Sequence, residues 1–122
     1  MDYPTILIAD DQMHMLALLQ ASLLPLGGRI LKAGSGEEAL VTAASTKIDL
    51  LLIDFEMLDL TGVETVRQIK QSPAYLDLPV IMITARGQNR IRVEATLAGV
   101  TQIILKPFSP KALLETVRRL LI

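Results

Sequence analysis

Short apolar runs alternate with amphipathic stretches along the whole chain. The apolar runs cover residues 5–9, 29–33, 48–53, 79–83 and 100–105. A short apolar run bounded by turn residues is typical of a strand buried on both faces of a parallel sheet. Helical spacing of apolar residues between the runs predicts helices over residues 12–24, 37–46, 62–71, 88–98 and 110–120. This alternation predicts one doubly wound α/β domain spanning residues 1–122.

Composition supports a sheet with helices on both faces. Hydrophobic residues make up 51% of the 122 residues, and the mean hydropathy is +0.44. No apolar run reaches the ~18 residues that a membrane span needs, so we expect no membrane insertion. The amino end lacks the basic and apolar regions of a secretory signal. The absence of cysteine excludes disulfides and thiol chemistry and favours a cytoplasmic location.

Charge and aromatic content argue against direct nucleic-acid binding. The net charge is -1, and the lysines and arginines are scattered rather than gathered into a stripe. Aromatic residues make up 3% of the chain, which leaves little material for stacking on bases. The chain also lacks both glycine-rich nucleotide-binding motifs, the P-loop and the Rossmann fingerprint.

Polar residues stand at the carboxyl ends of four predicted strands. They are Asp10 and Asp11, Asp54, Thr84, and Lys106. In a doubly wound sheet these ends lie on one rim, where ligands bind. Crowded carboxylates favour a hard divalent cation such as Mg²⁺, and a lysine and a hydroxyl suit phosphate oxygens. The set predicts a phosphoryl-transfer site with a carboxylate nucleophile.

Four motifs carry these residues in the same order: ILIADD at 6–11, LLLIDFEMLDLTG at 50–62, VIMITA at 80–85 and ILKPF at 104–108. Together they resemble the receiver domains of bacterial response regulators, such as CheY. GEEAL at 36–40 also resembles the start of that family's second helix. The resemblance extends from about residue 5 to the last helix. It implies a five-stranded parallel sheet in the order 2-1-3-4-5.

The resemblance also implies a role for each site residue. Asp54 is the expected phosphoacceptor. Asp10, Asp11, Asp54 and the backbone carbonyl of Glu56 are the expected ligands of Mg²⁺ or Mn²⁺. Lys106, Thr84 and Ala85 are expected to bind the phosphoryl group, and Thr84 is expected to turn toward it after transfer.

Two positions depart from the family pattern. The family usually has tyrosine or phenylalanine three residues before the strand-five lysine, where this chain has Ile103. Isoleucine has no hydroxyl to report its position, so the usual aromatic switch is absent. The family proline four residues after the phosphoacceptor is Leu58 here, which predicts a less constrained loop.

Plainer interpretations of the same residues remain open. Asp54 alone is compatible with capping the turn that follows its strand. Asp10 and Asp11 are compatible with capping the first helix, a role that coexists with metal binding. Lys106 is compatible with an ordinary surface lysine. His14, the only histidine, is expected to be a solvated residue of the first helical turn.

Two further groups of residues suggest contacts around the site. Met13 is expected to be exposed and, with Pro107 and Phe108, to form a docking patch for the phosphodonor. Glu56 and Arg86 lie two residues after Asp54 and Thr84. They are expected either to pair across the mouth of the site and prolong the phosphorylated state, or to be separate solvated charges.

The main hypothesis is a receiver domain of a two-component phosphorelay that accepts a phosphoryl group from a histidine kinase or histidine phosphotransfer protein. It would catalyse only its own phosphorylation and dephosphorylation. The alternative is a receiver-like interaction module with phosphorylation-independent output; an enzyme acting on a small phosphorylated substrate is disfavoured because no general acid stands near the site. A homodimer through the fourth helix, fifth strand and fifth helix is a further possibility. The apolar end at residues 120–122 favours a fragment of a longer protein.

Overall fold

The computed structural model of the chain describes residues 3–122. Its strands are β1 (Thr5–Ala9), β2 (Arg29–Ala33), β3 (Leu50–Asp54), β4 (Val80–Thr84) and β5 (Gln102–Leu105). Its α-helices are α1 (Met13–Leu23), α2 (Gly36–Ser45), α3 (Gly62–Ile69), α4 (Asn89–Ala98) and α5 (Pro110–Leu120). Two short 3₁₀ turns, Leu24–Leu26 and Pro73–Tyr75, were not predicted from the sequence.

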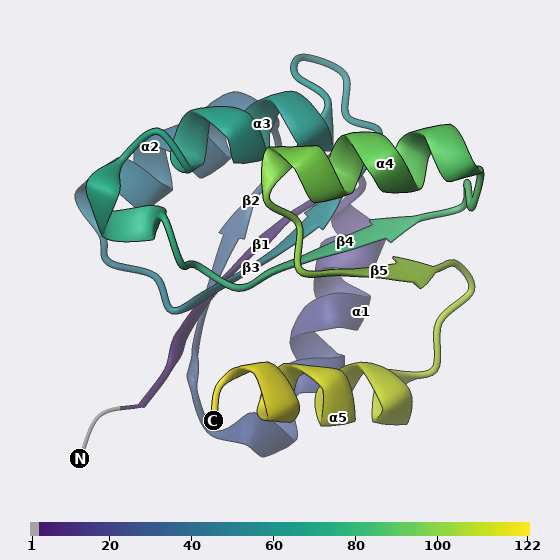
Figure 1. Cartoon of the computed structure of the whole chain (residues 1–122). Coiled ribbons are helices and arrows are strands. Elements are labelled where there is room, and N and C mark those ends of the chain that lie inside the picture. The colour runs from purple at the N-terminus through teal and green to yellow at the C-terminus, as the bar shows by residue number, and fades with distance from the viewer. Residues whose placement is uncertain (1–2) are drawn as a thin grey trace.

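The strands form one parallel sheet in the order β2-β1-β3-β4-β5, which confirms the predicted fold class. The helices α2, α3 and α4 cover one face of the sheet, and α1 and α5 cover the other (Figure 1). The less apolar strand β2 lies at one edge, as expected, and β5 lies at the other. This winding brings all five carboxyl ends of the strands to one rim.

Successive strand residues face opposite layers, so each strand supplies two cores. In β1, Leu7 packs under α2 and α3, whereas Ile6 and Ile8 pack against α1 and α5. All five residues of β3 and of β4 are buried. Burying a leucine or isoleucine side chain contributes roughly 1.5–3 kcal/mol, so these two central strands form the rigid base on which the rim is built.

Two strands, β3 and β5, begin two residues later than the apolar pattern predicts. Ile48 lies outside β3 because its amide donates to the Tyr75 hydroxyl (3.2 Å) instead of to a neighbouring strand. Val100 lies outside β5 because its amide donates to the Ala95 carbonyl (2.9 Å) at the end of α4. Both side chains are still buried, which explains why they extend the apolar runs.

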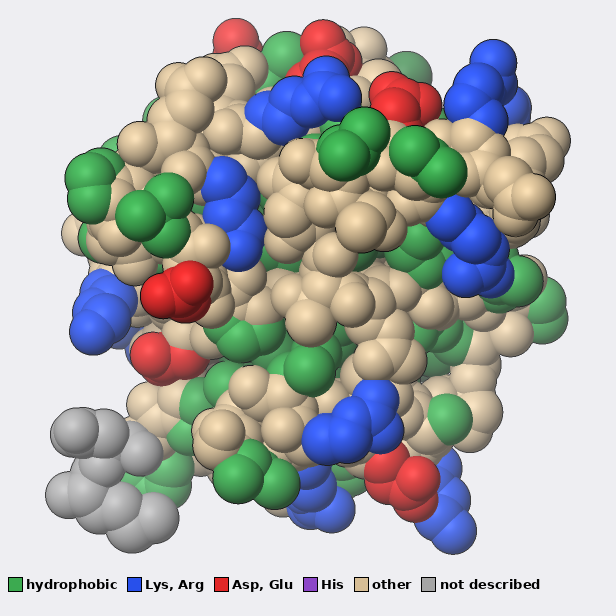
Figure 2. Space-filling view, viewed as in Figure 1, with side chains coloured by type: hydrophobic (Ala, Val, Ile, Leu, Met, Phe, Trp, Pro, Cys, Tyr) green, Lys and Arg blue, Asp and Glu red, His purple; other side chains and the backbone are tan. Residues whose placement is uncertain are grey.

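The helices place basic side chains on the face around β5. Figure 2, which has the same orientation as Figure 1, shows lysine and arginine side chains around α4 and around α5. Among residues 3–122, no helix has the length and apolar character that a membrane crossing requires.

Candidate functional site

The rim of the sheet holds a cluster of carboxylates. Asp54 is the last residue of β3, and Asp10 follows β1 directly. The register pairs Ala9 with Ile53, so the two aspartates leave neighbouring strands at the same level. The side chain of Asp10 is 2% exposed and that of Asp54 10%. With Asp11, each offers a carboxylate oxygen within 4.8 Å of the others.

Close backbone packing beneath Asp54 fixes its position. The Phe55 amide donates to the Ile83 carbonyl (3.1 Å), which continues the ladder to β4 past the end of β3. The chain then turns back so closely that a side chain at Gly62 would collide with the Asp54 carbonyl. Glycine is therefore required at the start of α3, where the chain passes the Asp54 carbonyl.

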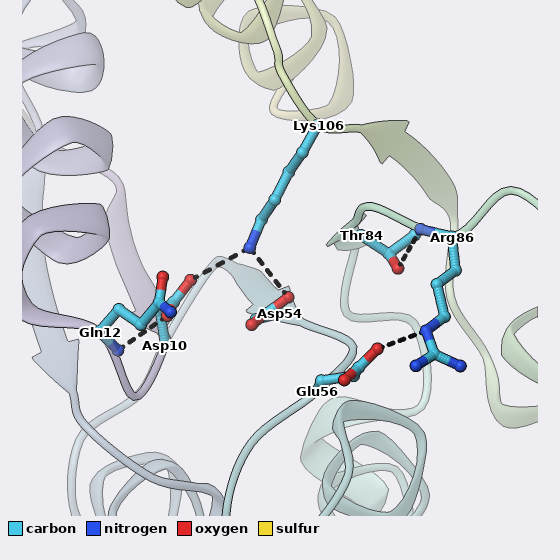
Figure 3. Close-up of polar contacts among 7 residues, drawn as sticks. All are labelled: Asp10, Gln12, Asp54, Glu56, Thr84, Arg86 and Lys106. Atoms are coloured by element: carbon cyan, nitrogen blue, oxygen red, sulfur yellow. Dashed lines mark hydrogen bonds and ion pairs between the residues drawn. The ribbon is translucent and has the colours of Figure 1, made fainter.

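Lys106 reaches the cluster from the edge strand. Its backbone amide donates to the Thr84 carbonyl (2.9 Å) just beyond β5. Its side chain extends past β4, and Nζ lies 3.3 Å from Asp54 Oδ1 and 3.9 Å from Asp10 Oδ2. Figure 3 shows the ammonium group directed at the gap between the two carboxylates.

Burial is the dominant influence on the ionisation of both aspartates. It raises the pKa of Asp54, as does the nearby Asp10 carboxylate, while Lys106 acts in the opposite direction. Burial also raises the pKa of Asp10, against a hydrogen bond from the Gln12 amide (2.9 Å) and the charge of Lys106. One ammonium does not offset the burial of two carboxylates, so this site favours an additional cation.

Thr84 and Arg86 occupy the other side of Asp54. Thr84 is buried at the end of β4, and its hydroxyl oxygen accepts from the Arg86 amide (3.0 Å). Arg86 Nε lies 2.6 Å from Glu56 Oε1 in the loop after β3, and both side chains are more than half exposed. The ion pair joins the loops that follow β3 and β4 (Figure 3).

These groups line a cleft of about 330 Å³ that opens on Asp54. Its lining comprises Asp11, Gln12, Asp54, Glu56, Met57, Leu58, Thr84, Ala85 and Lys106. The cleft is large enough for a phosphoryl group, with carboxylates on one side and an ammonium on the other. The Lys106 ammonium, together with a cation held by the carboxylates, can cancel negative charge on a phosphoryl group that transfers to Asp54.

Comparison with known proteins shows which family shares this fold and site. The family model for the response regulator receiver domain matches residues 6–118. The chain belongs to the response regulator receiver family. The receiver domain is 31% identical over 117 residues to the phosphate regulon transcriptional regulatory protein PhoB of Pseudomonas aeruginosa, covering 96% of this chain but 51% of that protein. It thus spans about half the length of that relative.

A shorter relative and a solved structure match over most of their length. A chemotaxis protein CheY homolog of Campylobacter jejuni is 32% identical over 112 residues, covering 90% of this chain and 86% of that protein. The structure of Vibrio cholerae chemotaxis protein CheY4 matches with a TM-score of 0.92 at 28% identity, covering 97% of this chain and 98% of that one. Receiver domains are signalling modules of two-component systems, and this chain is one of them.

Asp10 and Asp11 do not cap helix α1 of the receiver domain. The helix begins after Gln12, which makes no side-chain cap, and Asp10 instead accepts from the Gln12 amide. The carboxylates of Asp10 and Asp11 thus take part in the cluster rather than in a helix cap. Ile103 is partly buried against the core beneath α4, beside Met82 of β4.

The predicted docking residues include an exposed methionine on α1 and two residues that line an apolar hollow. Met13 is 85% exposed, and the neighbouring His14 is also exposed, as expected. Pro107 and Phe108 line a separate apolar hollow of about 420 Å³ next to Lys106. The other residues lining this hollow are Met15, Leu18, Ala85 and Lys106. Of these residues, Met15 is partly buried.

One polar residue near the site was missed. Asp59, in the loop after β3, bonds the first two amides of α2. The sequence marks it only as a turn residue, because its partners are more than 20 positions away.

Proposed function

We propose that this receiver domain, residues 1–122, accepts a phosphoryl group onto Asp54 from a phosphohistidine of a sensor kinase or histidine phosphotransfer protein, in the cytoplasm. The observation that carries the proposal is the placement of Asp54 at the cleft. Carboxylates lie on one side of it, and the Lys106 ammonium lies 3.3 Å from its Oδ1.

The transfer is a displacement at phosphorus. A carboxylate oxygen of Asp54 forms a new O–P bond as the P–N bond to the donor imidazole breaks. The leaving imidazole nitrogen keeps the electron pair of that bond and can take a proton from solvent. Aspartate is a weak nucleophile, so the rate depends on positioning and on cancelling charge on the transferring oxygens. The domain catalyses only this step and its own dephosphorylation, in which water attacks the phosphorus, the O–P bond to Asp54 breaks, and inorganic phosphate leaves.

The donor set fits Mg²⁺ or Mn²⁺. Asp10, Asp11 and Asp54 present hard oxygen ligands within 4.8 Å of one another, and the Glu56 backbone carbonyl would add a fourth. A bound divalent cation supplies charge cancellation to the phosphoryl oxygens. It would also counter the burial and the repulsion by Asp10 that together raise the pKa of Asp54.

Lys106, Thr84 and Ala85 would hold the product. The Lys106 ammonium would bind one phosphoryl oxygen, and the Ala85 backbone amide would donate to another. In this structure the Thr84 hydroxyl oxygen accepts a hydrogen bond from the Arg86 amide. To turn toward the phosphate, Thr84 would have to break this hydrogen bond. Such a turn would alter the start of the loop between β4 and α4 and thereby shift a conformational equilibrium.

A second candidate is a receiver module whose output does not depend on phosphorylation. Ile103 supports it, since the residue lacks a hydroxyl and packs on the core. Under this proposal the acidic site would be chemically competent without being coupled to β5.

The docking surface for the phosphodonor would be Met13 together with Pro107 and Phe108. A homodimer would use the face of α4, β5 and α5, where Val93, Leu97 and Leu105 are exposed. The basic side chains around α4 and α5 in Figure 2 would oppose such pairing unless acidic groups of the other copy meet them.

Phosphorylation by a small donor tests the main proposal. Wild type and Asp54→Asn are incubated with phosphoramidate and Mg²⁺, and their intact masses are measured. We expect wild type alone to gain one phosphoryl group, and Lys106→Ala to gain it more slowly. No gain in wild type would leave the phosphorylation-independent module.

A further inference from the structure

The loop between β3 and α3 is tied to the start of α2 by one carboxylate. Asp59 Oδ1 accepts from the Gly36 amide (3.0 Å), and Oδ2 accepts from the Glu37 amide (2.9 Å). These amides have no partner within the helix, because the first turn of a helix leaves its donors free. Ser35 Oγ accepts from the next amide, that of Glu38 (3.1 Å). Asp59 thus takes up two of the first three amides of α2.

Close packing accompanies these hydrogen bonds. A Cβ atom added at Gly36 would lie 2.8 Å from Leu60 Cβ and 2.6 Å from Thr65 Oγ1. The loop and the first turn of α2 are therefore in direct contact, and glycine is needed where they meet. The two amides that donate to Asp59 and this contact fix the loop from its outer side.

The part of the loop nearest the site has few other restraints. Phe55 and Gly62 close its base through a 2.8 Å hydrogen bond. Glu56 is held through its side chain, by an ion pair with Arg86 that is more than half exposed. Leu58 is 94% exposed and packs against little. Thr61 is held by its capping box with Glu64 of α3. Between Met57, which is buried, and Thr61, Asp59 provides the hydrogen bonds that anchor the loop to α2.

We propose that Asp59 is a positioning residue for the cation site: by fixing the loop onto α2, it holds the Glu56 backbone carbonyl where a divalent cation can use it. The inference rests on the proposed function, which assigns Mg²⁺ to the carboxylate cluster. Asp59 itself points away from the cleft, toward α2, so it acts through the loop. Residues that orient metal ligands from outside the coordination sphere change metal affinity by ~10–100-fold.

Magnesium titration of three variants tests this role. Asp59→Ala removes both acceptors, and Asp59→Asn keeps one and covers the case in which the alanine variant fails to fold. Ser35→Ala is the matched control, because it removes a cap from the same helix end without touching the loop. We expect Asp59→Ala to raise the Mg²⁺ Kd about tenfold, Asp59→Asn to raise it less, and Ser35→Ala to stay within about twofold of wild type.

Two further measurements separate positioning from general destabilisation. In Mg²⁺-free protein, amide exchange of residues 56–60 should accelerate in the Asp59 variants but not in Ser35→Ala. At limiting Mg²⁺ the Asp59 variants should be phosphorylated by phosphoramidate more slowly than wild type. At saturating Mg²⁺ their rate should recover, since Asp59 touches no reacting atom.

The outcomes distinguish this inference from the proposed function. If wild type binds no Mg²⁺, the assignment of the cation fails and the inference fails with it. If wild type binds Mg²⁺ and both folded Asp59 variants bind it equally well, the inference alone is overturned. Equal weakening by Ser35→Ala would also overturn it, because the effect would then come from loosening α2.

Discussion

The ion pair between Glu56 and Arg86 gives a quantitative prediction about the lifetime of the phosphorylated state. The Nε–Oε1 distance is 2.6 Å, and the pair joins the two loops that flank Asp54. If Asp54 is phosphorylated as proposed, water would approach the phosphorus through the cleft that opens on Asp54. Breaking the pair by Arg86→Gln should therefore accelerate dephosphorylation.

Exposure limits the size of the effect. The Arg86 and Glu56 side chains are 52% and 59% exposed, and exposed pairs typically contribute about 0.2–1 kcal/mol. If about 0.5–1 kcal/mol of this pairing must be given up for water to enter, its loss accelerates hydrolysis about two- to fivefold. Thermal stability should change little, because the same small energy applies to unfolding.

A double-mutant cycle provides the assay. Dephosphorylation of wild type, Glu56→Gln, Arg86→Gln and the double variant is followed after removal of the phosphodonor, at low and at moderate salt. We expect both single variants and the double variant to share one faster rate, and the difference from wild type to shrink with salt. Arg67→Gln, an exposed arginine on α3, serves as the control. An unchanged rate in Arg86→Gln, or additive effects in the double variant, would refute the reasoning.

Three other predictions concern the metal-free and metal-bound protein. Burial raises the pKa of Asp10 and Asp54, so the ionised forms of these residues destabilise the fold. This destabilisation should lessen as pH falls through the raised pKa values. Asp54→Asn should therefore raise the free energy of unfolding at pH 7 by on the order of 1 kcal/mol, measured by urea unfolding without Mg²⁺. Mg²⁺ at about 100 times its Kd should stabilise wild type by about 2.7 kcal/mol, an effect that a chelator removes and Asp11→Asn reduces. Tyr75→Phe should cost about 1–3 kcal/mol in the same assay, because the buried hydroxyl donates to the Ala43 carbonyl (2.8 Å) and accepts from the Ile48 amide; equal stability would contradict this account.

The fold and the main site residues could be predicted because their signals are local in sequence. An apolar run followed by a carboxylate identifies both β3 and Asp54, and parallel strands in a doubly wound sheet bring such ends together. The same reasoning places Asp10 and Lys106 on one rim before any distance is known. Sequence alone does not give the 3.3 Å approach of Lys106 to Asp54, which depends on a side chain crossing β4.

Features that depend on distant partners were not predicted. Asp59 looks like an ordinary turn residue until α2 is placed beside it. Tyr75 lies in a segment without strand or helix periodicity, yet its hydroxyl accepts from the Ile48 amide and keeps that residue out of β3. Boundaries also shifted where an amide found a partner outside the sheet, as at Val100, although apolar character continued through the residue.

Chemical trapping of the phosphorylated residue shows directly whether Asp54 is the phosphoacceptor. Borohydride reduces an aspartyl phosphate to homoserine, so the site of modification survives digestion. Wild-type protein is treated with phosphoramidate and Mg²⁺, reduced, digested and analysed by tandem mass spectrometry. We expect homoserine at position 54, dependent on Mg²⁺ and at no other aspartate. Homoserine at Asp10 or Asp11 instead, or none at all in protein that binds Mg²⁺, would contradict this expectation.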